Sequence, residues 1–313
     1  MKTMVTGGAG LIGAHLCQKL LEDGSEVMAV DNLVTGAKEN IDPLFKNKKF
    51  SFKKLDITSS SFGREIAEAG NFDEIYHLAC PTGVPNIKTL GEEMILTCSL
   101  GTKNVLNLAL KMKSKVLFTS SSEVYGDPEV FPQSEEYRGH VDPVSFRAPY
   151  EEGKRFAETL CMLYFNKFNL PIKIVRLFNT YGLTKGDDTR VISQFIKDSV
   201  RHLPLNVFGT GLQTRTFSYV DDTVDGLLLI MKKGKAGEVY NLGSDSEITI
   251  LDVAKLVKKL AESKSKIVKV KAPFPDHKGR RPSISKIKKL GWRQNIFLAE
   301  GIKRMLFEKG HRI

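Results

Sequence analysis

The fold is decided by a stretch near the N-terminus, Lys2-Thr3-Met4-Val5-Thr6-Gly7-Gly8-Ala9-Gly10-Leu11-Ile12-Gly13. A short β-branched run leads into a glycine turn, and the apolar side of the following pattern holds Leu11, Ile12, Leu16, Leu20 and Leu21. Strand, glycine turn and helix in this order are the context of a dinucleotide fingerprint. Gly7 permits the tight turn, Gly10 lets the backbone approach a pyrophosphate, and Gly13 lets the helix pack on the strand. The helix N-terminus then offers free N–H groups and partial positive charge to phosphates.

An acidic residue follows the second predicted strand. That strand covers residues 26–30 and ends at Asp31, eighteen residues after Gly13. A carboxylate at this place accepts a hydrogen bond from a ribose 2′-OH and repels a 2′-phosphate. The sequence therefore predicts NAD as the cofactor in preference to NADP.

Strands and helices alternate over the first 177 residues. Further strands are predicted at 50–55, 73–78, 116–119 and 172–177, with helices between them ending near 66, spanning 94–111 and beginning at 149. This alternation predicts an α/β fold, a doubly wound parallel Rossmann sheet with a smaller, mostly C-terminal α/β lobe. The loops after Thr6, Val30, Leu55, Leu78 and Phe118 then lie on one edge, where ligands bind.

The chain reads less regularly after residue 177. We predict helices at 191–200, 221–231 and 251–261, strand-like segments at 205–208, 215–220 and 238–242, and a last helix ending near Glu308. Without a low-complexity linker, the two lobes are expected to interleave. The nucleotide-binding domain is predicted to comprise residues 1–177 plus about 211–243, and the second lobe residues 178–210 plus 244–313.

A polar stretch follows the fifth predicted strand, Thr119-Ser120-Ser121-Ser122-Glu123-Val124-Tyr125-Gly126. Alone, it is typical of a loop whose serines bond their own backbone. Later in the chain Pro149 opens a helix, and Tyr150 and Lys154, four residues apart, share one face of it. A nearby ammonium and a nicotinamide cation would lower the pKa of Tyr150 and make its phenolate a usable base.

The composition is that of an ordinary globular protein. Of 313 residues, 41% are hydrophobic and 27% charged. No apolar run approaches the roughly 18 residues of a membrane span, and the N-terminus does not resemble a secretory signal, so no membrane association is expected. Four scattered cysteines without a C-x-x-C or Cys/His cluster predict no metal site and a cytoplasmic location.

The net charge of +11 is concentrated at the C-terminal end. Residues 252–313 hold 18 Lys and Arg against 5 Asp and Glu, a balance of +13. A basic lobe attracts nucleic acid, an acidic surface or a small anion. Since no nucleic-acid-binding motif accompanies it, a solvated lysine-rich face is favoured and no nucleic-acid partner is expected.

These motifs resemble those of the extended short-chain dehydrogenases/reductases of the nucleotide-sugar epimerase/dehydratase group, over essentially the whole chain. The shared motifs are T-G-x-x-G-x-x-G at 6–13, Asp31-Asn32, Asp56, His77-Leu78-Ala79, Tyr150 with Lys154, Asn179, and Tyr219-Val220-Asp221-Asp222. Within this group the chain is similar to the UDP-glucuronate decarboxylases at 122–130, Glu152-Gly153-Lys154-Arg155, Gln213-Thr214-Arg215 and Arg280-Arg281-Pro282.

The resemblance implies NAD-dependent oxidation of the C4 hydroxyl of a nucleotide sugar, with decarboxylation of UDP-glucuronate through a 4-keto intermediate as the leading complete reaction. It implies that Tyr150 takes the proton from O4, that Lys154 holds the cofactor ribose and Tyr150, and that Ser121 hydrogen-bonds the same oxygen. Glu123 and Arg280 would act near C5 and C6. NAD would be held by Gly7, Gly10, Leu11, Ile12, Gly13, Asp31, Asn32, Asp56, Ile57, Leu78, Ala79, Tyr150 and Lys154, and the substrate by Pro81, Asn179, Val191, Arg215 and Arg280.

Two positions bear on neighbouring reactions. Ser122 stands where sugar 4,6-dehydratases carry an acid, which disfavours dehydration, and Glu123 stands where galactose-type 4-epimerases usually carry threonine. The chain departs from the decarboxylase pattern in the loop Cys80–Ile87 and at Cys98, which replaces an asparagine. A C4 dehydrogenase or epimerase of another NDP-hexose or GDP-heptose in bacterial surface polysaccharide synthesis therefore stays open, as does a non-catalytic NAD- or RNA-binding relative. The resemblance also implies a homodimer or homotetramer, built on the helices after Met94 and Tyr150.

Overall fold

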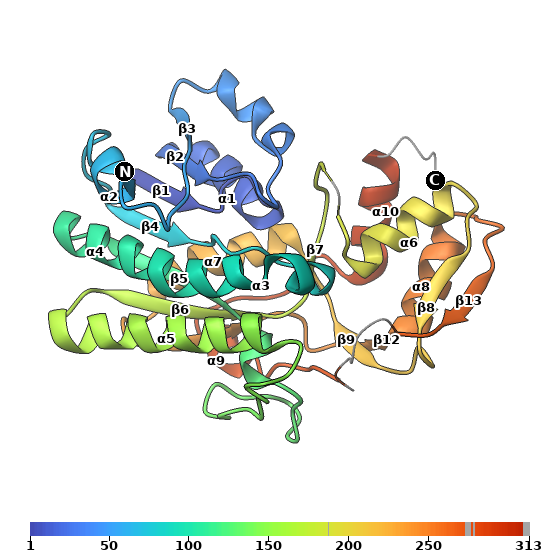
Figure 1. Cartoon of the computed structure of the whole chain (residues 1–313). Coiled ribbons are helices and arrows are strands. Elements are labelled where there is room, and N and C mark those ends of the chain that lie inside the picture. The colour runs from blue at the N-terminus through green and yellow to red at the C-terminus, as the bar shows by residue number, and fades with distance from the viewer. Residues whose placement is uncertain (187, 273–276, 278, 309–313) are drawn as a thin grey trace.

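The computed structural model describes residues 1–186, 188–272, 277 and 279–308. Its centre is a seven-stranded sheet in the order β11-β6-β5-β4-β1-β2-β3 (Figure 1), in which every neighbouring pair is parallel. In chain order the strands are β1 (Lys2–Thr6), β2 (Glu26–Asp31), β3 (Phe50–Lys54), β4 (Glu74–His77), β5 (Lys115–Ser121), β6 (Ile172–Leu177) and β11 (Val239–Leu242). This arrangement confirms the predicted doubly wound α/β sheet.

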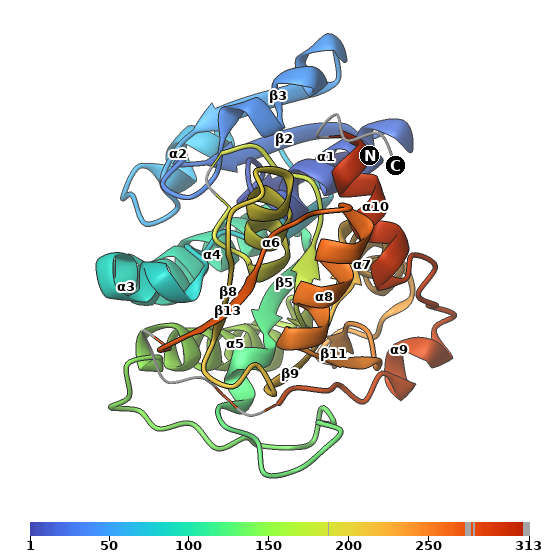
Figure 2. The same ribbon diagram turned by 90° about the vertical axis from the view of Figure 1, so that its right-hand side faces the viewer.

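Helices cover both faces of the sheet, and each face has its own apolar core. Helices α1 (Leu11–Glu22) and α7 (Val220–Lys233) contribute to one core. Helices α2 (Phe62–Ala67), α4 (Thr102–Met112) and α5 (Ala148–Phe168) contribute to the other. Figure 2 shows the two layers on opposite sides of the strands. Because both faces are covered, the central strands β1, β4, β5 and β6 are buried along most of their length.

The remaining elements form a smaller unit beside the carboxyl edge of the sheet (Figure 1). Its elements are α6 (Val191–Val200), β8 (Leu205–Phe208), β9 (Thr214–Thr216), β12 (Glu247–Thr249), α8 (Ile250–Leu260), β13 (Ile267–Val270) and α10 (Leu298–Glu308). Strand β8 pairs with β13 in parallel and β9 with β12 antiparallel. Where the chain crosses between the units, β7 (Thr180–Tyr181) pairs with β10 (Ser218–Tyr219). The short helix α9 (Ser285–Lys289) packs against β11. The exact division into two domains stays a prediction.

Several predicted boundaries were wrong. The strand predicted at 215–220 is two strands, β9 and β10, which pair with different partners, and its last residue, Val220, begins α7. The fifth strand continues past Thr119 to Ser121, because Ser120 and Ser121 still pair with β6. The helix predicted over 94–111 begins at Ile87 and is composite: α3 (Ile87–Leu96), a π-helical turn (Thr97–Gly101) and α4. The turn is supported by the Thr102 hydroxyl, which donates to the carbonyl of Thr97, five residues earlier. A π-helical turn inside a helix is common near functional sites.

Candidate active site

A cleft of about 740 Å³ lies at the carboxyl edge of the sheet, with walls from the sheet loops and the smaller unit. Every residue predicted for the site lines this cleft except Arg280. We call the part formed by Gly7–Gly13, Asp31 and Asp56 the glycine end, and the part formed by Ser121, Glu123, Tyr150 and Lys154 the tyrosine end. The loops after five parallel strands therefore meet at one edge, as the topology requires.

The glycine turn is shaped by backbone contacts. Gly7 has φ +71°, and a β-carbon there would approach the Ala79 nitrogen to 2.8 Å. A β-carbon on Gly13 would lie 2.1 Å from the carbonyl oxygen of Gly7, so only glycine fits. Gly10 precedes α1, whose first turn has no side-chain cap. The free N–H groups of that turn suit a pyrophosphate, so the observed cradle fits a dinucleotide.

Two carboxylates lie beside this turn. Asp31 accepts the backbone N–H of Ala9 at 3.0 Å and of Leu33 at 2.8 Å, while burial raises its pKa against these two donors. Asp56 accepts the side-chain amide of Asn32 at 2.8 Å and both the N–H and hydroxyl of Thr58 at 2.7 Å. Although burial raises the pKa of Asp56, these donors lower it overall. Both acids are thus fixed in orientation and still reach the cleft.

At the tyrosine end, Tyr150 and Lys154 share one face of α5, as predicted. The ammonium of Lys154 donates to the Thr119 carbonyl at 2.9 Å and lies 5.9 Å from the centre of the Tyr150 ring. Burial raises the pKa of Tyr150, against the opposing effects of Lys154 and of a hydrogen bond with the Ser121 side chain. Lys154 thus lowers this pKa as expected, and the predicted net lowering, which also includes the nicotinamide cation, stays a prediction. Lys154 keeps its charge because, although burial lowers its pKa, nearby thiol and phenol groups raise it overall.

Glu123 is held by two guanidinium groups and lies near an imidazole ring. Arg280 donates to its carboxylate at 2.9 Å and Arg147 at 3.2 Å, and the His277 ring nitrogen lies 3.8 Å away. Burial raises the pKa of Glu123, but Arg280, Arg147 and His277 lower it to about 2. Glu123 is therefore ionised near neutral pH and cannot act there as a general acid. Arg280 is 2% exposed and lies behind Glu123, where it also donates to the Ser122 hydroxyl at 3.2 Å.

Sequence reasoning missed three residues near this carboxylate, Arg147, Glu151 and His277. Glu151 is buried and pairs with the His277 ring at 2.9 Å. The sequence offered a signal only for Arg147, which stands three residues before Tyr150 at the start of α5 and so close to the predicted site. Ligand atoms of Glu123, Glu151 and His277 lie within 4.8 Å of one another. The two guanidinium groups on Glu123 already balance its charge, so this cluster does not favour a cation.

The predicted substrate residues line the same cleft, on several elements. Asn179 donates its side-chain amide to the Thr216 carbonyl at 3.2 Å, and Arg215 donates to the His277 carbonyl at 3.0 Å. Pro81 belongs to the loop after β4, and Val191 begins α6. These contacts tie the smaller unit to the region around Glu123, so both units build the site.

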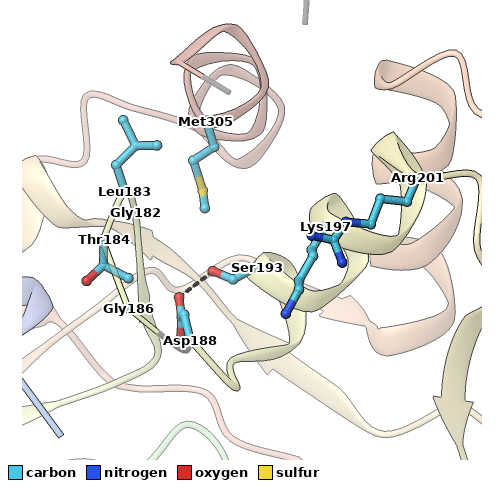
Figure 3. Close-up of a pocket in the computed structure, with 9 residues that line it drawn as sticks. All are labelled: Gly182, Leu183, Thr184, Gly186, Asp188, Ser193, Lys197, Arg201 and Met305. Carbon is cyan, nitrogen blue, oxygen red and sulfur yellow. Dashed lines mark hydrogen bonds between the residues drawn. The ribbon is translucent and has the colours of Figure 1, made fainter. Parts of the chain in front are cut away.

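A second cavity, of about 190 Å³, lies between α6, α10 and the loop residues 182–186 and 188 (Figure 3). Met305 points into it from α10, and the Ser193 hydroxyl bonds the carboxylate of Asp188 on its floor. It shares Thr184 and Asp188 with the main cleft. Its volume is about a quarter of the cleft's, so a dinucleotide fits only the larger space.

Among the described residues, no helix is long and apolar enough to cross a membrane.

Comparisons with known proteins agree with this geometry. The model of the NAD dependent epimerase/dehydratase family matches residues 3–243. UDP-glucuronic acid decarboxylase 1 of Arabidopsis thaliana is 41% identical over 315 residues, covering 100% of this chain and 71% of the relative. UDP-glucose 4-epimerase of Thermotoga maritima, solved with UDP-glucose, is 28% identical with a TM-score of 0.91 over 100% of both chains. dTDP-glucose 4,6-dehydratase of Streptomyces venezuelae, solved with NAD bound, is 25% identical with a TM-score of 0.90 over 98% of this chain and 96% of that one.

Proposed function

Because the chain belongs to the NAD dependent epimerase/dehydratase family, we propose that it binds NAD and oxidises the C4 hydroxyl of a nucleotide sugar, with UDP-glucuronate as substrate and decarboxylation as the complete reaction. One observation carries the proposal. The dinucleotide cradle at Gly7–Gly13 and the Ser121, Tyr150 and Lys154 side chains line a single cleft. The first group suits a cofactor, and the second suits proton removal from a sugar hydroxyl beside it.

The cofactor is assigned by the fit of its cradle. The glycine turn and the uncapped first turn of α1 would hold the pyrophosphate. Asp31 would accept from the adenosine ribose, with its orientation already set by Ala9 and Leu33. When bound, NAD supplies the acceptor for a hydride from sugar C4.

The side chains at the tyrosine end would remove the proton from the sugar O4. Tyr150 takes the proton from O4, and Lys154 stabilises the phenolate that this requires. Ser121 hydrogen-bonds Tyr150 in the chain and would orient the same sugar oxygen. Since burial raises the pKa of Tyr150, a positive charge brought in with the nicotinamide is needed to make it an effective base.

Decarboxylation follows from the chemistry of the product. A ketone at C4 beside a C5 that carries the carboxylate is a β-keto acid, and the ketone accepts the electron pair when carbon dioxide leaves. Glu123, ionised with a pKa of about 2, forms ion pairs with Arg280 and Arg147 at this end of the cleft. It cannot protonate a leaving 6-hydroxyl at neutral pH, and neither can the adjacent Ser122, so dehydration is disfavoured.

The test is incubation of the full chain with NAD and a panel of UDP- and GDP-sugars. Release of carbon dioxide with a UDP-pentose from UDP-glucuronate is the expected result. Accumulating NADH with a ketosugar would instead identify a C4 dehydrogenase, and a C4-inverted sugar an epimerase. The panel includes these two outcomes because the loop Cys80–Ile87 lines the cleft and departs from the decarboxylase pattern. Salt-sensitive RNA binding without turnover would contradict the enzyme assignment.

The proposal extends to a homodimer built on α3 and α5, which lie side by side (Figure 1). Apolar side chains on this face are exposed: Ile95, Leu96, Leu100, Phe156 and Leu163. Burying large apolar side chains of this kind is a common basis of stable self-association. Phe156→Glu should yield a monomer in sedimentation, while the control Phe307→Glu, on exposed apolar surface of α10, should not.

We also propose a reducing compartment, the cytoplasm, as its location. Cys17, Cys80, Cys98 and Cys161 are all free thiols. Fractionation of the source cells with an antibody against the chain tests this assignment.

A further inference from the structure

Two of the four cysteines meet beside the tyrosine end. Cys80 follows the loop start Leu78-Ala79 after β4, and Cys98 lies in the π-helical turn Thr97–Gly101. Their sulfur atoms are 3.5 Å apart, and both thiols are free. Cys17 and Cys161 are fully buried. The sequence separation of eighteen residues gave no indication of this contact.

The surroundings of this pair stabilise negative charge on sulfur. Lys154 acts on both thiols. The hydrogen bond between the thiols lowers the pKa of Cys98 to about 7, with Lys154 adding to the effect against burial. The same hydrogen bond, in which either sulfur can be the donor, raises the pKa of Cys80. One proton is therefore shared by two sulfurs, and the thiolate is the nucleophilic form.

The pair is reached through the active-site cleft. Cys80 is partly exposed and lines the cleft, whereas Cys98 is 2% exposed behind it. Cys98 packs on Gly153, where an added β-carbon would lie 3.3 Å from the Cys98 β-carbon and 3.5 Å from its sulfur. The dithiol thus contacts the turn of α5 that carries Tyr150 and Lys154.

We propose that Cys80 and Cys98 form a reactive dithiol, a modification site at which a peroxide produces an intramolecular disulfide that inhibits the enzyme. When the shared proton lies on Cys98, the thiolate is Cys80, which lines the cleft. It attacks one peroxide oxygen, the O–O bond breaks, and the other oxygen leaves as water or an alcohol after taking a proton. The Cys98 sulfur then attacks the resulting sulfenic acid, the S–O bond breaks, and its oxygen leaves as water with the Cys98 proton. Two thiols are oxidised and one peroxide is reduced.

Disulfide formation requires the sulfurs to come about 1.5 Å closer than they are. The movement falls on the start of the Cys80–Ile87 loop and on the turn packed against Gly153. It also removes the thiolate that faces Lys154. Since a misplacement of about 1 Å at a catalytic group costs as much as roughly 100-fold in rate, turnover should fall roughly 10- to 100-fold and recover with dithiothreitol.

The inhibition rests on the proposed function, but the dithiol is tested without turnover. The full chain, with and without equimolar hydrogen peroxide, is digested under non-reducing conditions and analysed by mass spectrometry. A peptide pair joined through Cys80 and Cys98 is expected. Phenylarsine oxide, which bridges two neighbouring thiols, should bind one per chain. Both signals should be lost in Cys98→Ser and kept in the control Cys17→Ser.

Three results would overturn the proposal. The first is the absence of the Cys80–Cys98 peptide pair in the wild-type chain after oxidation. The second is an equal loss of turnover in wild type and Cys98→Ser under peroxide. The third is formation of the disulfide with unchanged turnover. A chain that forms the disulfide but turns over no sugar nucleotide would instead refute the proposed function and leave the dithiol supported.

Discussion

At the glycine end of the cleft, Gly7, Gly13 and Asp31 come from the first 31 residues, and their constraints are backbone contacts. At the tyrosine end, the carboxylate of Glu123 is held by Arg280, which follows it by 157 residues. The glycine end is thus specified largely by local sequence, with the contact of Gly7 on Ala79 as the exception, whereas the tyrosine end depends on side chains gathered by tertiary structure. The two ends should therefore respond differently to substitution. A substitution at the glycine end acts through steric overlap, and one at the tyrosine end acts through unbalanced charge or lost proton transfer.

The contrast is tested most severely at Tyr150. Tyr150→Phe removes the phenol that would take the O4 proton but keeps the ring, so we expect turnover of UDP-glucuronate to fall about 10²- to 10⁴-fold. Affinity for NAD, measured by calorimetric titration, should change little because the glycine end is intact. Tyr164→Phe, on the same helix, is the matched control and removes only a hydrogen bond to Asn107. Turnover within a few-fold of wild type in the Tyr150 variant would contradict the mechanism.

The glycine end is broken by one methyl group. Gly13→Ala places a β-carbon 2.1 Å from the Gly7 carbonyl oxygen, so the turn must move. We expect the free energy of unfolding to fall by about 3 kcal/mol and NAD binding to be lost, as measured by urea unfolding and calorimetry. Gly63→Ala is the control, since no atom lies within 4 Å of its added carbon. Equal behaviour of the two variants would show that the cradle is not rigid.

The charge balance at the tyrosine end is tested with Glu123→Gln. At neutral pH this change leaves Arg280 and Arg147 without their carboxylate and should cost about 3 kcal/mol of unfolding free energy. The pKa of Glu123 is lowered from 4.5 to about 2 in the folded chain. Its stabilisation is therefore fully present above pH 4.5 and is lost as the pH falls towards 2.

The measurement is urea unfolding of wild type and Glu123→Gln across this range. The difference between them should be constant above pH 4.5 and shrink below it. A difference that does not depend on pH would mean that the variant acts through packing and not through charge. Glu129→Gln, which changes an exposed acid six residues after Glu123, is the control. Its difference from wild type in unfolding free energy should not change with pH in this way.

The smallest expected effect concerns cofactor choice. Asp31→Asn removes the charge that repels a 2′-phosphate, so the preference for NAD over NADP should weaken about tenfold, or about 1.4 kcal/mol. The ratio of the two dissociation constants measures it. Asp23→Asn, on exposed surface at the end of α1, should leave the ratio unchanged. An unchanged ratio in the Asp31 variant would show that other groups select the cofactor.

The sequence predicted the sheet well because strand, glycine turn and helix are local patterns with a fixed order. Strands β1 and β6 begin and end where predicted. The π-helical turn at Thr97–Gly101 was not predicted. The Thr102 hydroxyl, which bonds to the carbonyl of Thr97, also contacts His77 on β4, a long-range contact. Apolar periodicity records which face is buried and contains no information on such a contact.

The candidate site divides in the same way. Residues near a strand end or in one helical turn, such as Asp31 or Tyr150 with Lys154, were placed in the cleft by topology and spacing. The position of Arg280 behind Glu123, and the contact of His277 with Glu151, depend on a segment that returns from the other unit. No short-range pattern encodes that return.

The same return sets an order on protein synthesis. At about 5–20 residues per second, roughly 8 to 30 s separate the synthesis of Glu123 from that of Arg280. The seven strands are complete at Leu242, but Asp222 receives the N–H groups of Asn295 and Ile296 only later. A ribosome that releases the chain a few dozen residues early would therefore deliver a full Rossmann sheet with buried acceptors still open, a product suited to chaperones and proteases more than to catalysis.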